Sequence, residues 1–386
     1  MKISKLAFVF LLSLLMVGCW DNTDLVDINI VTGLGIDKDE DGKIVVTVQI
    51  VEPAAVHLTS SSQAGSGGSS QTKPVYVMSY KGETIYDALI SMKAIVDKRL
   101  FLSTNQILIL GERFCKDGID EALDFLHRNY QSEYRADVLV ARGTKPEEIL
   151  KIQPDMDAIP AMYIKGTAEN TVIRAKVEQK KLIELFKEIK NEAKQITIGQ
   201  ITKVDDKTVK TEGIAVFRDG KLVGWLDQYQ TRGYLFVTDK VDNTVISIQI
   251  PNGKIALEIK QSNAKREVKF KNGKPERLSI DIRLEGNIGE YIGKEILSSP
   301  DDIYKIEKML SQAVKKEVTM ALEKTQKDYS SDIFGFGELV HKYHPQYWKK
   351  AAKQWNDIFS QLPTDVKVDA KIRRSGLIKS PMKKDD

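Results

Sequence analysis

The sequence predicts a mixed α/β protein built from three successive domains, the last of them an antiparallel meander packed on a long helix. Strand-like and helix-like segments alternate along the first half of the chain, whereas the last third holds several β-branched runs and one long amphipathic segment. The length of 386 residues also exceeds what one hydrophobic core usually organises. We expect domains at residues 19–165, 166–240 and 241–375, between a signal peptide (1–18) and a basic tail (376–386).

The first nineteen residues are typical of a lipoprotein signal. Lys2 and Lys5 form a short basic region, residues 6–17 are almost all apolar, and Gly18 precedes Cys19. The apolar run is shorter than the roughly 20 residues that a membrane-spanning helix requires. We therefore expect that residues 1–18 are removed and that the Cys19 thiol carries a diacylglyceryl lipid, which anchors the chain to the outer face of a cytoplasmic membrane.

In the first domain, β-branched strands alternate with amphipathic helices. Residues 28–35 and 44–51 are separated by a polar segment that ends in Asp41-Gly42, which predicts a hairpin. Between residues 59 and 72 the chain is almost entirely Ser, Gly and Gln, a composition typical of a flexible loop. The other predicted elements are helices over 84–97 and 119–130, strands over 76–79, 106–110 and 136–141, and a helix that opens at Lys145-Pro146.

The predicted middle domain combines a helix with a β-hairpin. Asp219-Gly220 lies between two alternating apolar runs, and this dipeptide is a strong hairpin signal. Phe217 and Trp225, one in each arm, are the candidate anchors of a core or an interface. The predicted elements are a helix over 180–194 and strands over 197–203, 213–218 and 221–226.

In the last domain, four β-branched runs precede a long helix. Asn252-Gly253 and Asn272-Gly273 mark two of the turns, so we expect an antiparallel meander. Residues 299–302 (Ser-Pro-Asp-Asp) then supply a capping hydroxyl, a proline at the first helical position and two carboxylates in the first turn. They predict the start of a helix of about 25 residues that lays its apolar stripe across the meander. The predicted strands are 245–250, 254–260, 266–270, 277–285 and 365–373, with a second helix around 347–359.

Charge and cysteine content narrow the possible partners. Loss of Lys2 and Lys5 with the signal lowers the formal net charge from +4 to +2, so no basic excess favours nucleic acid. Cys115 is the only other cysteine, and it has no disulfide partner once Cys19 is acylated. We expect Cys115 to be buried and unreactive, and the fold to be stabilised by packing.

Patterns of catalysis or metal binding are weak. His341 and His344 have i, i+3 spacing, but no third ligand completes a coordination set, so an ordinary pair near a helix end is favoured. Gly33-Leu34-Gly35 resembles the start of a dinucleotide-binding fingerprint, yet the third glycine is missing and a strand follows where a helix is required. Hairpin geometry is the better explanation, and we expect no catalytic activity, no metal and no cofactor.

An aromatic and basic segment near the C-terminus leaves two interpretations open. Its aromatic side chains either line a ligand cleft or partner surface, or pack against the core of the last domain, which is favoured. Its lysines either contact anionic lipid head groups or lie on a solvated helix face, which is again favoured. These residues are Tyr343, Tyr347, Trp348, Trp355 and Phe359, with Lys342, Lys349, Lys350 and Lys353.

Three groups of residues, in this order and spacing, carry a family resemblance. The first is Gly18-Cys19-Trp20-Asp21 running into residues 29–37, Asn-Ile-Val-Thr-Gly-Leu-Gly-Ile-Asp. The second is Asp332-Ile-Phe-Gly-Phe-Gly337 before Tyr343-His-Pro-Gln-Tyr-Trp348, and the third is Val366-Lys-Val368 with Ile372-Arg-Arg-Ser-Gly376. Over essentially its whole length the chain resembles the Ger(x)C family, the lipoprotein C subunits of spore germination receptors in endospore-forming bacteria.

The resemblance implies a non-catalytic subunit of a nutrient germinant receptor. It implies three mixed α/β domains, an acylated Cys19, and residence on the spore inner membrane beside two integral-membrane receptor subunits of A and B type. Cys19 alone carries over as a functional residue, and the resemblance names no ligand-binding residue.

Two other classes remain open. A solute-binding lipoprotein of a transporter is also acylated and of similar length, but it usually has two lobes of repeated βαβ units with ligand at the hinge. A lipoprotein enzyme is the third possibility, and loss of activity on substitution of one buried carboxylate would identify it.

Overall fold

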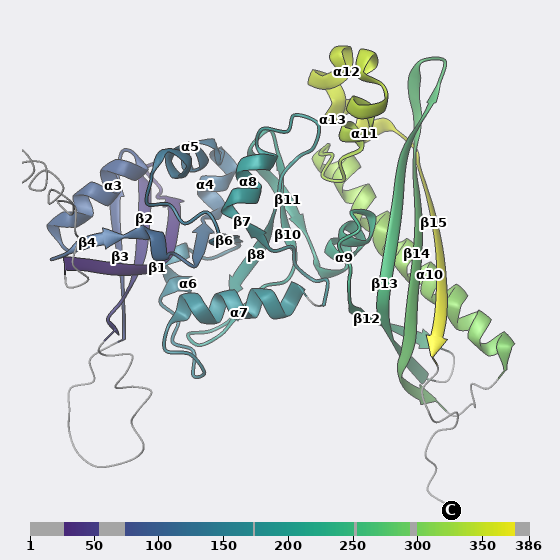
Figure 1. Cartoon of the computed structure of the whole chain (residues 1–386), viewed down its shortest axis with the longest axis horizontal. Coiled ribbons are helices and arrows are strands. Elements are labelled where there is room, and N and C mark those ends of the chain that lie inside the picture. Colours follow the sequence, from purple (N-terminus) through teal and green to yellow (C-terminus); the bar gives the residue numbers. More distant parts are fainter. Residues whose placement is uncertain (1–26, 54–73, 173, 251–252, 294–298, 375–386) are drawn as a thin grey trace, which may run out of the picture.

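Two β-sheets organise the chain (Figure 1). The computed structural model describes residues 27–53, 74–172, 174–250, 253–293 and 299–374. The first sheet has eleven strands. Eight follow the order β11-β10-β8-β6-β5-β1-β2-β3, and the other three pair at its margins, β4 with β1, β7 with β6 and β9 with β8. The second sheet has four strands in the order β12-β13-β14-β15. Helices cover both sheets, which confirms the predicted mixed α/β class. Within the described ranges, no helix combines the length and the apolar character needed to cross a membrane.

One half of the first sheet is an antiparallel meander. The predicted hairpin is confirmed, because β1 and β2 pair antiparallel, with Ile36 opposite Val46, and Gly42 in the turn has a φ of +81°. β3 extends the meander on the far side of β2. Short β4 pairs in parallel with the first residues of β1. These strands are β1 (Ile28–Lys38), β2 (Ile44–Val51), β3 (Val75–Gly82) and β4 (Arg99–Phe101).

The other half begins with parallel strands. β5, β6 and β8 run parallel to one another, and β6 is buried at all five of its residues, as expected for a strand covered on both faces. Because β8 pairs with β6, the sheet continues across the boundary predicted between residues 165 and 166. The predicted Asp219-Gly220 hairpin is confirmed between β10 and β11. The strands are β5 (Ile107–Leu110), β6 (Asp137–Ala141), β7 (Lys180–Lys181), β8 (Thr197–Lys203), β9 (Val209–Lys210), β10 (Ile214–Arg218) and β11 (Lys221–Leu226).

Two helical layers enclose the first sheet. Apolar residues of α3, α4, α5 and α8 form one core with one face, and those of α6 and α7 form a separate core with the other. Of these, α7 was not predicted, and the helix expected over 180–194 begins two residues later and ends at Glu188. The helices are α3 (Ile85–Ser91), α4 (Glu112–Asp117), α5 (Asp120–Arg128), α6 (Pro146–Leu150), α7 (Pro160–Val172) and α8 (Leu182–Glu188), with 3₁₀ turns η2 (Met92–Ala94) and η3 (Leu102–Thr104).

The second sheet packs on one long helix. β12, β13 and β14 form the predicted antiparallel meander, and β15 adds in parallel to β14. The two strands predicted at 254–260 and 266–270 are one continuous strand, so the expected break between them is wrong. α10 begins at Pro300 with the predicted cap, because the Ser299 hydroxyl accepts from the Asp302 amide at 3.1 Å. The elements are β12 (Thr244–Ile250), β13 (Gly253–Lys271), β14 (Lys274–Gly293), β15 (Thr364–Arg374) and α10 (Pro300–Glu323).

The remaining helices fill the space between the sheets and cap the second one. α9 contacts α10, and its apolar residues join one core with β10, β11 and the second sheet. The single helix predicted around residues 347–359 is two helices separated by a 3₁₀ turn. These elements are α9 (Gln228–Val237), π-helical η4 (Lys324–Tyr329), α11 (Phe336–Tyr343), α12 (Pro345–Ala351), η5 (Ala352–Gln354) and α13 (Trp355–Gln361).

Candidate functional site

The predicted lipidation site lies outside the described residues. Cys19 precedes residue 27, where the description begins. The Ser/Gly segment 59–72 and the basic tail 376–386 also lie outside it. The chain enters the described fold at β1, nine positions after Cys19.

The other chemically interesting residues are part of the packing. Cys115 is fully buried in the core beneath the first sheet, and burial raises the pKa of its thiol well above the ordinary value, helped by the charges of Asp37 and Glu112. His341 stacks on Trp348, with ring centroids 5.6 Å apart, and His344 stacks on Phe270 at 3.7 Å. In the part of the chain that the structure describes, no group of three or more His, Cys, Asp or Glu side chains forms a candidate metal site.

Gly33 and Gly35 allow a helix to approach the first sheet. A Cβ atom at Gly33 would lie 2.7 Å from Leu150 Cδ2, and one at Gly35 would lie 2.7 Å from Pro146 Cβ. Both neighbours belong to α6, so these glycines provide space for helix packing and not for a phosphate group. This close contact with α6, which the sequence did not predict, explains them more directly than hairpin geometry.

The aromatic segment near the C-terminus packs in the core. Trp348, Trp355 and Phe359 are buried, and Trp348 packs on Trp355 with ring centroids 5.8 Å apart. Tyr343, by contrast, is exposed. The favoured interpretation, packing of the C-terminal helices on the last domain, is therefore confirmed. The lysines of this segment lie on an exposed surface, as expected for a solvated helix face; they are Lys342, Lys349, Lys350 and Lys353.

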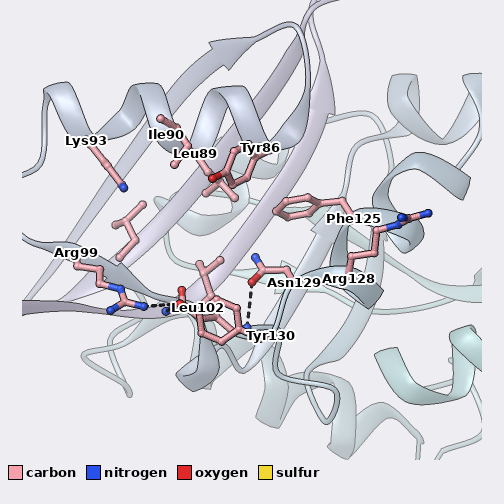
Figure 2. A pocket seen from close by; sticks show the side chains of 12 residues that line it. Tyr86, Leu89, Ile90, Lys93, Arg99, Leu102, Phe125, Arg128, Asn129 and Tyr130 are labelled. Atoms are coloured by element: carbon pink, nitrogen blue, oxygen red, sulfur yellow. Dashed lines mark hydrogen bonds between the residues drawn. The ribbon is translucent and has the colours of Figure 1, made fainter. Parts of the chain in front are cut away.

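A surface pocket opens beside β4, near the first residues of β1. Its volume is 560 Å³, within the range of roughly 300–1,000 Å³ that small-molecule sites occupy. Figure 2 shows its walls, which come from α3, α5 and the segment around β4. β4 pairs with β1 through Arg99 opposite Ile28, so the pocket lies beside the point where the chain enters the fold. The lining residues are Tyr86, Leu89, Ile90, Lys93, Arg99, Leu100, Leu102, Phe125, Arg128, Asn129, Tyr130 and Gln131.

The charged groups of this pocket are all basic. Its lining contains Lys93, Arg99 and Arg128 and no carboxylate. Arg128 is paired with Asp124 at 2.9 Å, whereas Arg99 donates to the Tyr130 hydroxyl at 2.6 Å. Among the described residues, neither Lys93 nor Arg99 forms an ion pair with a carboxylate. The pocket therefore offers two uncompensated cations above a floor that includes buried Leu89, Leu100 and Leu102.

A second notable cluster is a buried ionic network between the two sheets. The Glu178 carboxylate accepts from Thr197 Oγ1 at 2.5 Å, from Tyr234 Oη at 3.1 Å and from Lys240 Nζ at 2.5 Å, and Lys180 Nζ lies 3.4 Å away. Burial alone would raise the pKa of Glu178, but the two lysines and these hydrogen bonds outweigh it and lower the pKa to about 2. The network joins β8 to α9, so it connects the first sheet to the elements that carry the second.

Further buried charges fix the C-terminal elements. Arg232 of α9 donates from Nε to the Glu317 carboxylate of α10 at 2.8 Å, and its Nη2 donates to the other oxygen of the same carboxylate. Asp332 accepts from the backbone amides of Phe334 at 3.1 Å, Gly335 at 3.0 Å and Gly337 at 2.7 Å, and from Trp355 Nε1 at 2.7 Å. Burial raises the pKa of Asp332 although these donors oppose the shift.

The first sheet also contacts the C-terminal elements directly. Phe217 is fully buried, and Tyr329 of η4 both donates to the Trp225 carbonyl at 2.9 Å and accepts from the Trp225 amide at 3.0 Å. Of the two predicted anchors, Phe217 therefore lies in a core, whereas Trp225 lies at the interface between the first sheet and η4. The buried carboxylates of the junction are engaged by neighbouring donors, an arrangement suited to holding the two sheets together.

Sequence reasoning identified neither the pocket nor the junction network. The pocket residues come from three short segments between positions 86 and 131, and each segment alone resembles an ordinary amphipathic element. Apart from the near neighbours Glu178 and Lys180, the network pairs residues that are 17 to 62 positions apart, and nothing in their local sequence marks them as buried. Of the residues around the junction, the sequence pointed to Phe217 and Trp225 as anchors and to the Asp332–Gly337 segment as part of the family resemblance.

Comparison with known protein families matches both parts of the chain. Residues 21–203 match the family described as "Spore germination protein N-terminal domain". Residues 212–376 match the family described as "Spore germination B3/ GerAC like, C-terminal". Together the two families cover residues 21–376, apart from the short segment 204–211.

Individual relatives align along almost their whole length. The chain is similar to "Spore germination protein KC" of Bacillus subtilis (strain 168), with 29% identity over 99% of this chain and 98% of that protein. It is similar to "Spore germination protein B3" of the same organism, with 25% identity over 95% and 96%. A solved structure, "Crystal Structure of the GerBC protein", shares the fold with a TM-score of 0.54 and 19% identity over 88% of this chain and 96% of that chain. The chain belongs to the Ger(x)C family of spore germination proteins.

Proposed function

We propose that the chain is a non-catalytic, lipid-anchored subunit of a nutrient germinant receptor. The observation that carries this proposal is the match of both family domains over nearly the whole chain, directly after a lipoprotein signal that ends in Cys19. A spore germination protein with such a signal is expected on the outer face of the cytoplasmic membrane, which becomes the spore inner membrane. Its partners there are two integral-membrane receptor subunits of A and B type and the membrane lipid.

The architecture supports a role in assembly or signalling. Buried charges at the junction tie the first sheet to α9, and Arg232 ties α9 to α10 beneath the second sheet. Leaving one partner of a buried ion pair unpaired costs about 3–5 kcal/mol, so a rearrangement that separated these charges would be disfavoured. Two sheets joined in this way suit a subunit that assembles with membrane partners, or that passes a signal between them, when the spore responds to a nutrient.

A solute-binding lipoprotein fits the architecture less well. That class usually binds its ligand at the hinge between two lobes of repeated βαβ units. Here the second sheet is an antiparallel meander with one added strand, and the junction is filled by buried side chains. α3 and β4, which contribute residues to the 560 Å³ pocket, lie at the opposite end of the first sheet from β10, β11 and α9 (Figure 1).

Deletion and complementation test the proposal. In a strain without paralogues, loss of the gene should abolish or slow germination on nutrients and leave a stimulus that bypasses the receptors effective. Wild-type protein should restore the response, whereas the Cys19→Ala variant, matched for expression, should not. An unchanged nutrient response in the deletion strain would exclude the receptor role, and saturable binding of a nutrient to the isolated chain would favour the solute-binding alternative.

A further inference from the structure

The basic pocket has the chemistry of a site for an anion. Figure 2 shows Lys93 and Arg99 on opposite walls, Lys93 beside α3 and Arg99 on β4. The pocket lining holds no carboxylate, and in the described part of the chain neither cation has an acidic partner. Charge-assisted hydrogen bonds from Lys and Arg to phosphate or carboxylate are among the strong polar contacts that proteins make. An anionic group between these two side chains would supply the missing partner.

The remainder of the pocket is apolar. Leu89, Leu100 and Leu102 are at most 8% exposed and contribute to its floor, whereas Ile90 is 40% exposed. Tyr86 and Tyr130 contribute aromatic rings that are largely exposed. Tyrosine is enriched where a protein meets a membrane interface, because the ring is apolar and the hydroxyl is wet. The ligand that fits this combination carries an anionic group next to an apolar part.

The position of the pocket indicates where such a ligand comes from. Arg99 is paired in register with Ile28, nine positions after Cys19. Nine residues of fully extended chain span at most about 32 Å, so a lipid on Cys19 would keep Ile28, and with it β4, within reach of the membrane surface. α12, which carries the exposed lysines Lys349 and Lys350, by contrast lies at the far end of the molecule from β4 (Figure 1).

We propose that the pocket formed by α3, β4 and α5 binds the phosphate-bearing headgroup of an anionic phospholipid. The lipid would place its phosphate between Lys93 and Arg99 and the start of its chains against Ile90 and the leucine floor. This contact rests on the proposed anchoring at Cys19, and it would orient the N-terminal end of the first sheet toward the membrane. The lipid anchor would set the distance of the chain from the membrane, and the pocket would set its orientation.

Vesicle binding by unacylated protein tests the pocket separately from the anchor. The probe is the mature chain with Cys19→Ser, mixed with phosphatidylcholine vesicles that contain or lack phosphatidylglycerol and then sedimented. We expect binding only when phosphatidylglycerol is present. A basic residue at an anionic surface is worth about fivefold in affinity, so Lys93→Gln with Arg99→Gln should weaken binding by about 25-fold.

Three controls decide the interpretation. Lys349→Gln with Lys350→Gln removes the same charge from α12 and should leave binding unchanged. Ile90→Gln keeps the net charge and should weaken binding, because it removes part of the apolar wall. Circular dichroism melts of all variants should match the unsubstituted protein, since the three pocket side chains are exposed.

Several results would overturn the proposal. They are equal binding by the Lys93/Arg99 variant, loss of binding only in the α12 control, an unaffected Ile90→Gln variant, and no preference for phosphatidylglycerol. Glycerol 3-phosphate that binds the pocket as tightly as vesicles do would assign it to a free anion instead of a lipid. Failure here leaves the receptor role intact, because that role is tested by germination of spores that carry the acylated protein.

Discussion

The buried carboxylate of Glu178 should contribute strongly to stability, and substitution to glutamine should show how much. Glu178→Gln keeps the size of the side chain and removes its charge, which leaves Lys180 and Lys240 without their shared partner. The pKa of Glu178 is about 2 in the fold, against an ordinary value of 4.5. Each unit of that difference corresponds to about 1.4 kcal/mol, so the ionised carboxylate stabilises the fold by about 3 kcal/mol at pH 7. Breaking a buried ion pair costs a similar amount.

The same pKa shift fixes how this loss depends on pH. The folded-state pKa of Glu178 is lowered, so its stabilising effect is fully present above about pH 4.5 and is lost as the pH falls toward 2. The difference in free energy of unfolding between wild type and Glu178→Gln should therefore shrink from about 3 kcal/mol at pH 7 to about 2 kcal/mol at pH 3.5.

Urea unfolding followed by tryptophan fluorescence measures this difference at both pH values. The matched control is Glu285→Gln, which removes an exposed carboxylate that pairs with Arg373 at 2.9 Å. This control should change stability little, because solvent screens an exposed pair. A Glu178→Gln variant as stable as wild type at pH 7, or a difference that grows as the pH falls, would refute the assignment of a charged, paired Glu178.

Other substitutions test separate parts of the fold. Asp332→Ala leaves three backbone amides and Trp355 Nε1 without an acceptor. We therefore expect the free energy of unfolding to fall by about 3 kcal/mol or more and the near-ultraviolet circular dichroism spectrum to change. Asp357→Ala, at an exposed carboxylate, is the control, and an unchanged spectrum of the Asp332 variant would contradict this role. Gly35→Ala places a Cβ 2.7 Å from Pro146 Cβ and should lower the free energy of unfolding in urea by about 1–3 kcal/mol. Gly166→Ala is the control: it lies in α7 with no atom within 4 Å of the added Cβ and should raise the free energy of unfolding by about 0.5 kcal/mol. Equal effects of the two substitutions would argue against tight packing of α6. Ser299→Ala removes the cap of α10 and should cost about 1 kcal/mol, as a shift in the same unfolding curve. Cys115 should react with a thiol reagent only after unfolding, and rapid labelling of the native protein would show that it is accessible.

Local sequence signals predicted the elements that local chemistry determines. The Asp219-Gly220 turn has positive φ at both residues, as the hairpin requires, and Ser299-Pro300 starts α10 with the expected cap. The chemistry of these turns and caps is contained in two to four adjacent residues. The fold class followed from the order of such elements.

Local sequence signals could not predict which distant strands pair, or which polar segments continue a strand. Gln261–Lys265 is polar and resembles a turn, yet it continues β13, because the two long strands pair with each other through this region and do not need a buried face there. Nothing near Thr197–Lys203 indicates that it pairs with β6, some 60 positions earlier. The helix α7 has only a weak apolar stripe, so its periodicity did not reveal it.

The candidate sites were predictable only where one segment carries them. The predicted lipoprotein signal is continuous, so the prediction could be made from the first nineteen residues alone. The basic pocket and the Glu178 network each need three or more segments to come together. Their residues are common surface types until the fold places them side by side.

Membrane partition of wild type and Cys19→Ala in sporulating cells, combined with affinity capture of the wild-type protein from solubilised spore membranes, tests the central claim most directly. The account predicts that the wild type sediments with the membrane and brings down two integral-membrane receptor subunits, whereas Cys19→Ala is lost from the membrane fraction. Equal membrane partition of both proteins would contradict the lipid anchor. Capture of a transporter, or of no membrane protein, would contradict the receptor role.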